Sequence, residues 1–108
     1  MKPTLNMPPD KPIDWSPKAK KDLRDIWRYY ARAASLEVAD GILHKISVET
    51  ERIGRHPTPG REHDEFPGLR RILVHPHTVF FRITPEKAQV ARIIHEERDF
   101  PTLLKGEY

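Results

Sequence analysis

Three short runs rich in β-branched and aromatic residues, all within residues 69–104, constrain most strongly what this chain can fold into. The first turn between them is His75-Pro76-His77, and the second is Pro85-Glu86-Lys87. Strands separated by so few residues pair antiparallel, because a parallel pair needs a crossover of about a dozen residues or more. The sequence therefore predicts a three-stranded antiparallel meander.

Basic and imidazole side chains alternate with apolar ones along this predicted meander. Successive side chains of a strand point to opposite faces, so each strand has one face toward a core and one away from it. Strict alternation in the last strand puts Val90, Arg92 and Ile94 on one face and Ala91, Ile93 and His95 on the other. The basic and imidazole residues of the segment are Arg70, Arg71, His75, His77, Arg82, Arg92, His95 and Arg98.

Two amphipathic helices are predicted before the meander, joined as a hairpin over residues 17–54. Ser16 caps the first helix and Pro17 suits its first position, while Ser35 caps the second. Gly54 is expected to end the second helix in the left-handed conformation. Gly41 either permits a close helix crossing or is simply tolerated. The two apolar stripes are Leu23, Ile26, Trp27, Tyr30, Ala31 and Ala34, then Leu36, Ala39, Ile42, Leu43, Ile46, Thr50 and Ile53.

The remaining segments complete one domain over residues 13–104, followed by a tail at 105–108. Residues 1–12 contain four prolines, Pro3, Pro8, Pro9 and Pro12, and are predicted to form an extended, flexible arm. Residues 13–15 alternate as a short edge strand, and residues 55–68 form a long loop broken by proline and glycine, with Phe66 as its anchor.

One layer of helices on one layer of sheet buries both helical stripes and one sheet face, which predicts an α+β fold of order βααβββ. Trp15, Trp27 and Phe81 are expected in its core. The opposite sheet face is predicted to stay partly open and to carry apolar side chains, Leu73 or Phe80 and Ile93, beside its cationic ones. Such a mixed face is expected to dock another chain.

Composition excludes several classes of protein. The 108 residues suffice for one domain, the net charge is only +3, and there is no cysteine, so disulfides, thiolate nucleophiles and cysteine metal sites are excluded. No apolar run approaches the length of a membrane span and the first ten residues lack the core of a signal peptide, so a cytoplasmic protein is expected.

No cofactor or metal is predicted. The six histidines, of which His75 and His77 come nearest to a ligand pair, have no third ligand at suitable spacing. The chain also lacks a phosphate-cradling glycine loop and a serine–histidine–carboxylate order.

Several ordered segments resemble the ParE-type toxins of the RelE/ParE superfamily. The opening is Trp15-Ser16-Pro17-x-Ala19-x-x-Asp22-Leu23-x-x-Ile26-Trp27-x-Tyr29. The loop and next strand resemble the family in Arg55-x-Pro57, Gly60-Arg61 and Pro67-Gly68-Leu69-Arg70-Arg71. The last strands resemble it in Val79-Phe80-Phe81-Arg82-Ile83 and in Ile93-Ile94-His95-x-x-Arg98-Asp99-x-Pro101-x-Leu103-Leu104.

The resemblance implies the toxin of a type II toxin–antitoxin module, held by a cognate antitoxin in a heterotetramer or larger assembly. ParE-type toxins act on DNA gyrase, whereas RelE-type relatives cut messenger RNA on the ribosome. The RelE nucleases use lysines in and after the long loop and a tyrosine near the end of the last strand. This chain has no lysine between Lys45 and Lys87 and has His95-Glu96-Glu97-Arg98 in place of that tyrosine.

A non-enzymatic gyrase inhibitor is therefore the preferred hypothesis. It would use Arg71, Arg82, His95 and Arg98 to bind its target, since the arginine fork holds carboxylates in two places. A ribonuclease is the first alternative, with Arg71, Arg82 and His95 around the scissile phosphate. A non-toxic partner subunit of an autorepressor complex is the second.

Overall fold

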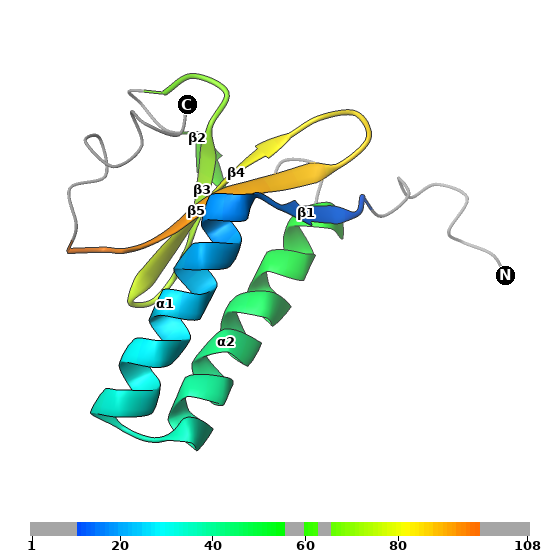
Figure 1. The fold of residues 1–108 in the computed structure, drawn as a ribbon. Coiled ribbons are helices and arrows are strands. Elements are labelled where there is room, and N and C mark those ends of the chain that lie inside the picture. Colours follow the sequence, from blue (N-terminus) through cyan, green and yellow to red (C-terminus); the bar gives the residue numbers. More distant parts are fainter. Residues whose placement is uncertain (1–10, 56–59, 63–65, 98–108) are drawn as a thin grey trace, which may run out of the picture.

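The computed structural model describes residues 11–55, 60–62 and 66–97, which form two helices packed on a five-stranded sheet (Figure 1). In Figure 1 the two helices lie side by side, and β1 is at the end of the hairpin remote from their connection. The elements are β1 (Ile13–Trp15), α1 (Pro17–Ala33), α2 (Leu36–Glu51), the 3-10 helix η2 (Arg52–Arg55), β2 (Arg61–Glu62), β3 (Arg70–Val74), β4 (His77–Ile83) and β5 (Ala88–His95).

Both predicted helix caps are confirmed. The Ser16 hydroxyl accepts a hydrogen bond from the amide of Ala19 at 3.0 Å, and the Ser35 hydroxyl accepts one from the amide of Val38 at 3.1 Å. Each cap satisfies an amide that has no partner within its helix. The chain therefore reverses direction within two residues and forms the predicted helical hairpin.

The prediction for the end of α2 is wrong. The helix ends at Glu51, and Gly54 lies within η2 without a positive φ. The carbonyl of Lys11 occupies the place where a Cβ of residue 54 would lie, and the amide of Lys11 donates to the Gly54 carbonyl at 2.9 Å. Glycine is needed there for close backbone approach rather than for a left-handed turn.

The predicted meander is confirmed as β3, β4 and β5, but it belongs to a larger, mixed sheet of order β1-β5-β4-β3-β2. The strand β1 pairs parallel to β5, with Ile13 opposite Ala88, so the sheet is not purely antiparallel as predicted. The helical hairpin lies between β1 and β5 in the chain and supplies the long crossover that parallel pairing requires. The predicted loop over residues 55–68 contains β2, which pairs with β3.

A β-bulge in β5 changes which residues face the helices. Phe81 pairs with Val90 and Phe80 with Arg92, so Ala91 is the extra residue. Val90 and Ile93 therefore both join the core beneath the helices, whereas Ile94 lies in a cluster on the other face. The strict alternation predicted for this strand, with Val90 and Ile94 on one face, is wrong for this reason.

The main core lies between the helices and the sheet, as predicted. Phe81 is fully buried in it and Trp15 packs against it. Trp27 is instead half-buried outside this core, where its indole N–H donates to Asp40 at 2.8 Å and ties α1 to α2. The buried members are Ala19, Ile46, Ile53, Val74, Val79, Phe81, Ala88, Val90 and Ile93.

The opposite sheet face is less open than predicted. Phe80 is fully buried there with Leu69 and Ile94, and Phe66 packs against them, which confirms its role as an anchor. Ile93 belongs to the other face because of the bulge. Leu73 alone of the three predicted apolar residues remains outside, with 63% of its surface exposed.

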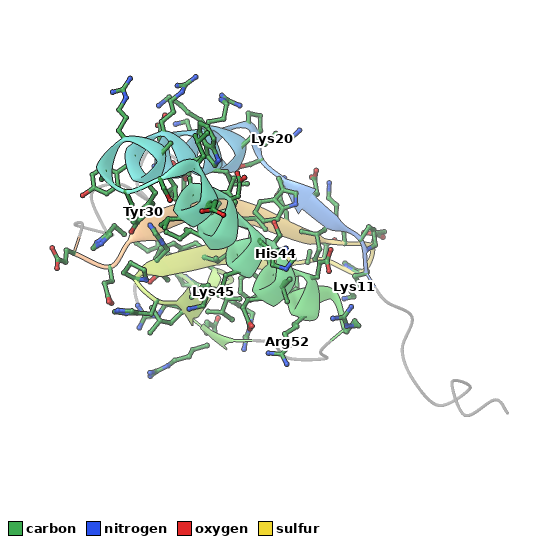
Figure 2. All side chains as sticks on the ribbon, turned by 90° about the horizontal axis from the view of Figure 1, so that it is seen from below. Lys11, Lys20, Tyr30, His44, Lys45 and Arg52 are labelled. Atoms are coloured by element: carbon green, nitrogen blue, oxygen red, sulfur yellow. The ribbon has the colours of Figure 1, made fainter. Side chains whose placement is uncertain are left out.

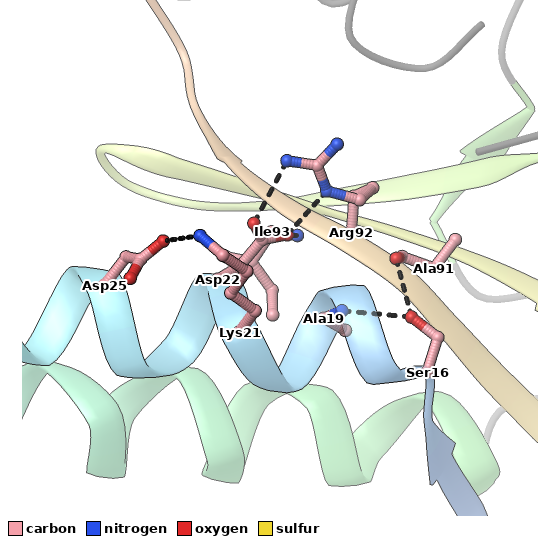
Figure 3. A network of polar contacts seen from close by, with 8 residues as sticks. All are labelled: Ser16, Ala19, Lys21, Asp22, Asp25, Ala91, Arg92 and Ile93. Carbon is pink, nitrogen blue, oxygen red and sulfur yellow. Dashed lines mark hydrogen bonds and ion pairs between the residues drawn. The ribbon is translucent and has the colours of Figure 1, made fainter. Parts of the chain in front are cut away.

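Polar groups of α1 close the edge of β5 beyond the short β1 (Figure 3). The amide of Ser16 donates to the carbonyl of Val90 at 3.0 Å, and its hydroxyl donates to the carbonyl of the bulged Ala91 at 2.8 Å. The Asp22 carboxylate accepts the amide of Ile93 at 2.9 Å and two bonds from the Arg92 guanidinium at 2.7 and 3.0 Å. We call this set the α1–β5 seam. The seam provides hydrogen-bond partners for backbone groups of β5 that would otherwise need a neighbouring strand.

The end of the predicted arm is attached to the domain. The Lys11 ammonium donates to the carbonyl of Thr84 at 2.8 Å, and the carbonyl of Pro12 accepts from the amide of Ala88 at 3.0 Å. Residues 1–10 and 105–108, the rest of the predicted arm and the tail, lie outside the described residues. Of the described helices, neither α1 nor α2 has the length and apolar character to span a membrane.

Two glycines of the helical region should respond oppositely to alanine. A Cβ at Gly41 would meet nothing within 4 Å, so Gly41→Ala should raise the free energy of unfolding by up to about 1 kcal/mol through helix propensity alone. A Cβ at Gly54 would collide with the Lys11 carbonyl, so Gly54→Ala should lower it by about 1–3 kcal/mol. Urea denaturation of both variants measures this, and equal effects would contradict the assigned roles.

The α1–β5 seam should dominate the stability of α1. Asp22 and Arg92 keep only 12% and 17% of their side chains exposed, so Asp22→Ala would remove two hydrogen bonds from a largely buried guanidinium and the acceptor of the Ile93 amide. We expect a loss of about 3 kcal/mol or more in the free energy of unfolding. Asp25→Ala is the matched control, since its 2.7 Å pair with Lys21 is half-exposed and should contribute little. A loss in Asp22→Ala as small as that in Asp25→Ala would contradict the stabilising role of the seam.

Candidate functional site

The sequence-predicted binding residues divide between the two faces of the sheet. Arg71 pairs with Phe80 in the register of β3 and β4, and Arg82 lies two residues beyond Phe80 on β4. Cross-strand partners and alternate residues share a face. Arg71 and Arg82 therefore lie on the face opposite the helices, where Phe80 is buried.

The short strand β2 adds a cation that was not among the predicted site residues. Arg61 pairs with Arg71, so it belongs to the same face, and its side chain is exposed. Gly60 makes this approach possible with a φ of 66°, because a Cβ there would collide with the Arg71 carbonyl. The Gly60-Arg61 pair was visible in the sequence, but nothing in a predicted loop indicated the strand. We call Arg61, Arg71, Arg82 and the exposed Leu73 the cationic face.

His95 is not part of this face. It pairs with His77 where β4 begins and β5 ends, and the register of Val79 with Ile93 defines this face as the helix side. The two imidazole rings lie 5.5 Å apart in an edge-to-face arrangement, and Tyr30 of α1 lies 6.1 Å from the His77 ring. The Nδ1 atom of His95 accepts a bond from the amide of Glu97 at 3.1 Å, so we infer that its neutral form carries the proton on Nε2.

These rings line a half-open cavity of about 420 Å³ between the second half of α1 and the ends of β4 and β5. Its walls combine aromatic, imidazole and aliphatic side chains, and we call it the aromatic pocket. The adjacent tyrosines Tyr29 and Tyr30 were the sequence signal for it, but only the register of the strands brings two histidines opposite them. Its lining includes Ile26, Tyr29, Tyr30, His77, Ile93 and His95.

His77 is the most perturbed titratable group of the described chain. Only 3% of its surface is exposed, and its Nδ1 atom has no hydrogen-bond partner. Burial lowers the pKa of His77 from 6.5 to about 4, together with the nearby His95 ring and, more weakly, His75. Only Glu96 acts in the opposite direction, and its raising effect is smaller than that of burial. His77 is therefore neutral at pH 7.

Arg98 lies outside the described residues, so its predicted place at the rim of the sheet has no structural counterpart here. The three residues that the ribonuclease hypothesis requires are not brought together, because Arg71 and Arg82 share one face and His95 lies on the other. His75 bonds Glu96 at 3.1 Å, and no group of three potential metal ligands occurs among the residues described.

Because His77 is buried in its neutral form, we expect the free energy of unfolding to decrease as the pH is lowered. The unfolded chain takes up this proton near pH 6.5 but the folded chain only near pH 4, so the contribution is complete above pH 6.5 and is lost between these values. At pH 4.5 we expect the loss at this residue to reach about 2–3 kcal/mol. Denaturation of the wild type and His77→Phe at pH 7.5 and 4.5 measures it.

His77→Phe keeps a ring in the cavity but cannot be protonated, so it should lose less stability than the wild type on acidification. His44→Phe, at an exposed position of α2, is the control and should retain the wild-type response. Equal acid sensitivity of the wild type and His77→Phe would refute the assignment.

Comparison with known proteins identifies the family. The model for the ParE toxin of type II toxin–antitoxin systems, parDE, matches residues 13–100. Toxin ParE1 of Caulobacter vibrioides is 31% identical over 87 residues, which are 80% of this chain and 90% of the relative. Toxin ParE1 of Mycobacterium tuberculosis is 31% identical over 86 residues, covering 78% of this chain and 88% of the relative.

Solved structures show the same fold. A chain of the chromosomal ParDE toxin–antitoxin system from P. aeruginosa superposes with a TM-score of 0.72 at 24% identity, covering 79% of this chain and 95% of that one. A chain of the YoeB dimer from Staphylococcus aureus gives a TM-score of 0.56 at 16% identity, covering 81% and 98%. The family model spans most of the described fold, and the resemblance seen in the sequence is confirmed: this chain belongs to the ParE toxin family of type II toxin–antitoxin systems.

Proposed function

We propose that this ParE toxin inhibits DNA gyrase by binding it through the cationic face, without catalysis, and that a cognate antitoxin encoded beside it neutralises it. The observation that carries the proposal is the grouping of Arg61, Arg71 and Arg82 with the exposed Leu73 on one sheet face. Arginine forks beside an apolar side chain suit an acidic protein surface. Arg98 is proposed to extend this face.

The separation of His95 from these arginines supports binding over phosphodiester cleavage. A metal-free ribonuclease needs its base and acid within hydrogen-bond reach of the phosphate that the cations hold. His95 instead lies beside His77, on the helix side of the sheet. Its ring nitrogen Nδ1 is also engaged by the amide of Glu97.

A ribosome-dependent messenger RNA endonuclease remains the second candidate, favoured by the aromatic pocket. The ring of His77 lies 6.1 Å from that of Tyr30 and 5.5 Å from that of His95, which groups three titratable side chains, and Arg92 also lines the cavity. Arg92 is held by Asp22 in the seam, which reduces its value for binding a phosphate.

The decisive experiment compares the two targets in one strain. Induced expression should produce cleaved plasmid DNA and an SOS response, and the purified toxin should inhibit gyrase supercoiling. Messenger cleavage mapped by primer extension, with no effect on gyrase, would replace the proposal with the endonuclease. Absence of any growth defect would indicate the non-toxic partner subunit. Co-purification with the neighbouring gene product tests neutralisation, and its failure at low salt would contradict the toxin–antitoxin assignment of this pair.

Variants of the cationic face should separate target binding from folding. Arg71→Ala and Arg82→Ala are each expected to weaken gyrase inhibition about tenfold, the usual scale for a well-placed interfacial arginine. Lys45→Ala on α2 is the exposed-cation control and should retain full activity. His95→Ala should change activity by less than the two arginine variants, with circular dichroism confirming the fold of each. Loss of toxicity in folded His95→Ala alone would overturn the binding model.

A further inference from the structure

His77, which lines the aromatic pocket, has a ring nitrogen without a hydrogen-bond partner. The Nδ1 atom of His77 is buried and unbonded, although the pocket beside it is open to the outside. A buried polar atom left unpaired carries a desolvation cost that a hydrogen bond would remove. The pocket therefore favours an occupant that fills apolar space and can offer a hydrogen-bonding group to the His77 imidazole.

The other walls of the pocket define the rest of this occupant. Ile26, Ile93 and the tyrosine rings offer hydrocarbon and aromatic surface, and Tyr29 is 64% exposed at the rim. The Tyr29 and Tyr30 rings are already arranged edge to face, 5.1 Å apart. A tyrosine or tryptophan side chain combines an apolar body with a polar tip and fits this lining.

The helix beside the pocket is the most basic part of the described chain. Along α1, six basic and two acidic side chains leave a surplus of four positive charges, more than the net +3 of the whole chain. Arg28, Tyr29 and Arg32 line a shallow depression that adjoins the aromatic pocket through Tyr29 and Asp25. Figure 2 shows Lys20 of α1 and Arg52 on opposite sides of the molecule. The basic residues of this α1 ridge are Lys18, Lys20, Lys21, Arg24, Arg28 and Arg32.

We infer that the aromatic pocket and the α1 ridge form one docking site for an acidic segment of the antitoxin, which inserts a single tyrosine or tryptophan side chain into the pocket. The inference rests on the proposed function for its partner and adds where that partner is held. The ridge draws the acidic segment to α1, because complementary charge mainly speeds encounter. The buried aromatic anchor then slows dissociation.

A protein segment fits this site better than a nucleic acid. The guanidinium that lines the pocket, that of Arg92, is already held by Asp22 in two hydrogen bonds. The carboxylate of Asp25 lines both hollows, and it is half-exposed even while it pairs with Lys21. A nucleobase in the pocket would hold its phosphate close to this carboxylate, separated from the base only by the sugar, and the two negative charges would repel. A peptide can place its acidic residues away from its aromatic anchor.

The test measures association and dissociation rates of the purified toxin with the purified product of the neighbouring gene. The double variant Arg28→Glu/Arg32→Glu should slow association at least tenfold at low salt, and the difference should shrink at high salt. Tyr29→Ala and His77→Phe should each speed dissociation about tenfold and leave the salt dependence unchanged. The double variant Lys45→Glu/Arg52→Glu removes the same charge from another surface and should stay within twofold of the wild type.

The outcomes separate the inference from the proposed function. A wild-type complex that all these variants form equally well overturns the docking site, while the toxin–antitoxin proposal stands. Absence of any complex with the wild type overturns both. Tighter binding of a labelled single-stranded RNA oligonucleotide than of the antitoxin, weakened by Tyr29→Ala, would replace the protein partner with a nucleic acid. Because Tyr29 is exposed, its variant tests the pocket even if His77→Phe alters folding.

Discussion

The backbone edge of β5 is the constraint on which the rest of this fold depends. The strand has β4 on one side, but β1 covers only its first three residues on the other. Beyond that point Ser16, the N-cap of α1, bonds the carbonyls of Val90 and Ala91, and Asp22 of α1 bonds the amide of Ile93. A serine that caps a helix and an aspartate in its second turn thus replace a missing strand, which fixes α1 against the sheet.

The same seam explains why cations of one sheet have different roles. Arg92 carries the charge of a binding residue, yet Asp22 holds it in two bonds and buries it against the edge of β5. Removing such a pair from water is costly unless its hydrogen bonds are made, so Arg92 is committed to the fold. Arg61, at the other edge of the sheet, is exposed. Position relative to the edge of β5, and not charge alone, separates structural from accessible arginines.

Much of the fold could be predicted because its signals are local. Ser16 and Ser35 mark the helix starts, and the tight turns at 75–77 and 85–87 leave the meander no other pairing. The bulge at Ala91 has no local signal, since it arises from pairing with Phe80 and Phe81 and is stabilised by Ser16, distant in the chain. It moves Ile93 to the helix side. The same distinction applies to the two candidate surfaces. That Arg71 and Arg82 share a face could be predicted from simple alternation along their strands. The grouping of Tyr30, His77 and His95 could not, because it depends on the register of the strands and on the packing of α1.

Under the proposed function, the two surfaces also limit the ways in which an antitoxin could neutralise this toxin. The aromatic pocket lies on the helix side of the sheet, whereas the cationic face lies on the other. An acidic segment seated only along α1 would therefore leave Arg71 and Arg82 uncovered. Neutralisation by direct masking requires the segment to continue around a rim of the sheet and reach the second face. Otherwise the antitoxin must exclude the target by its bulk. A segment that wraps both faces would bury more surface than one seated on either face alone, and linking the two contacts in one chain would strengthen binding.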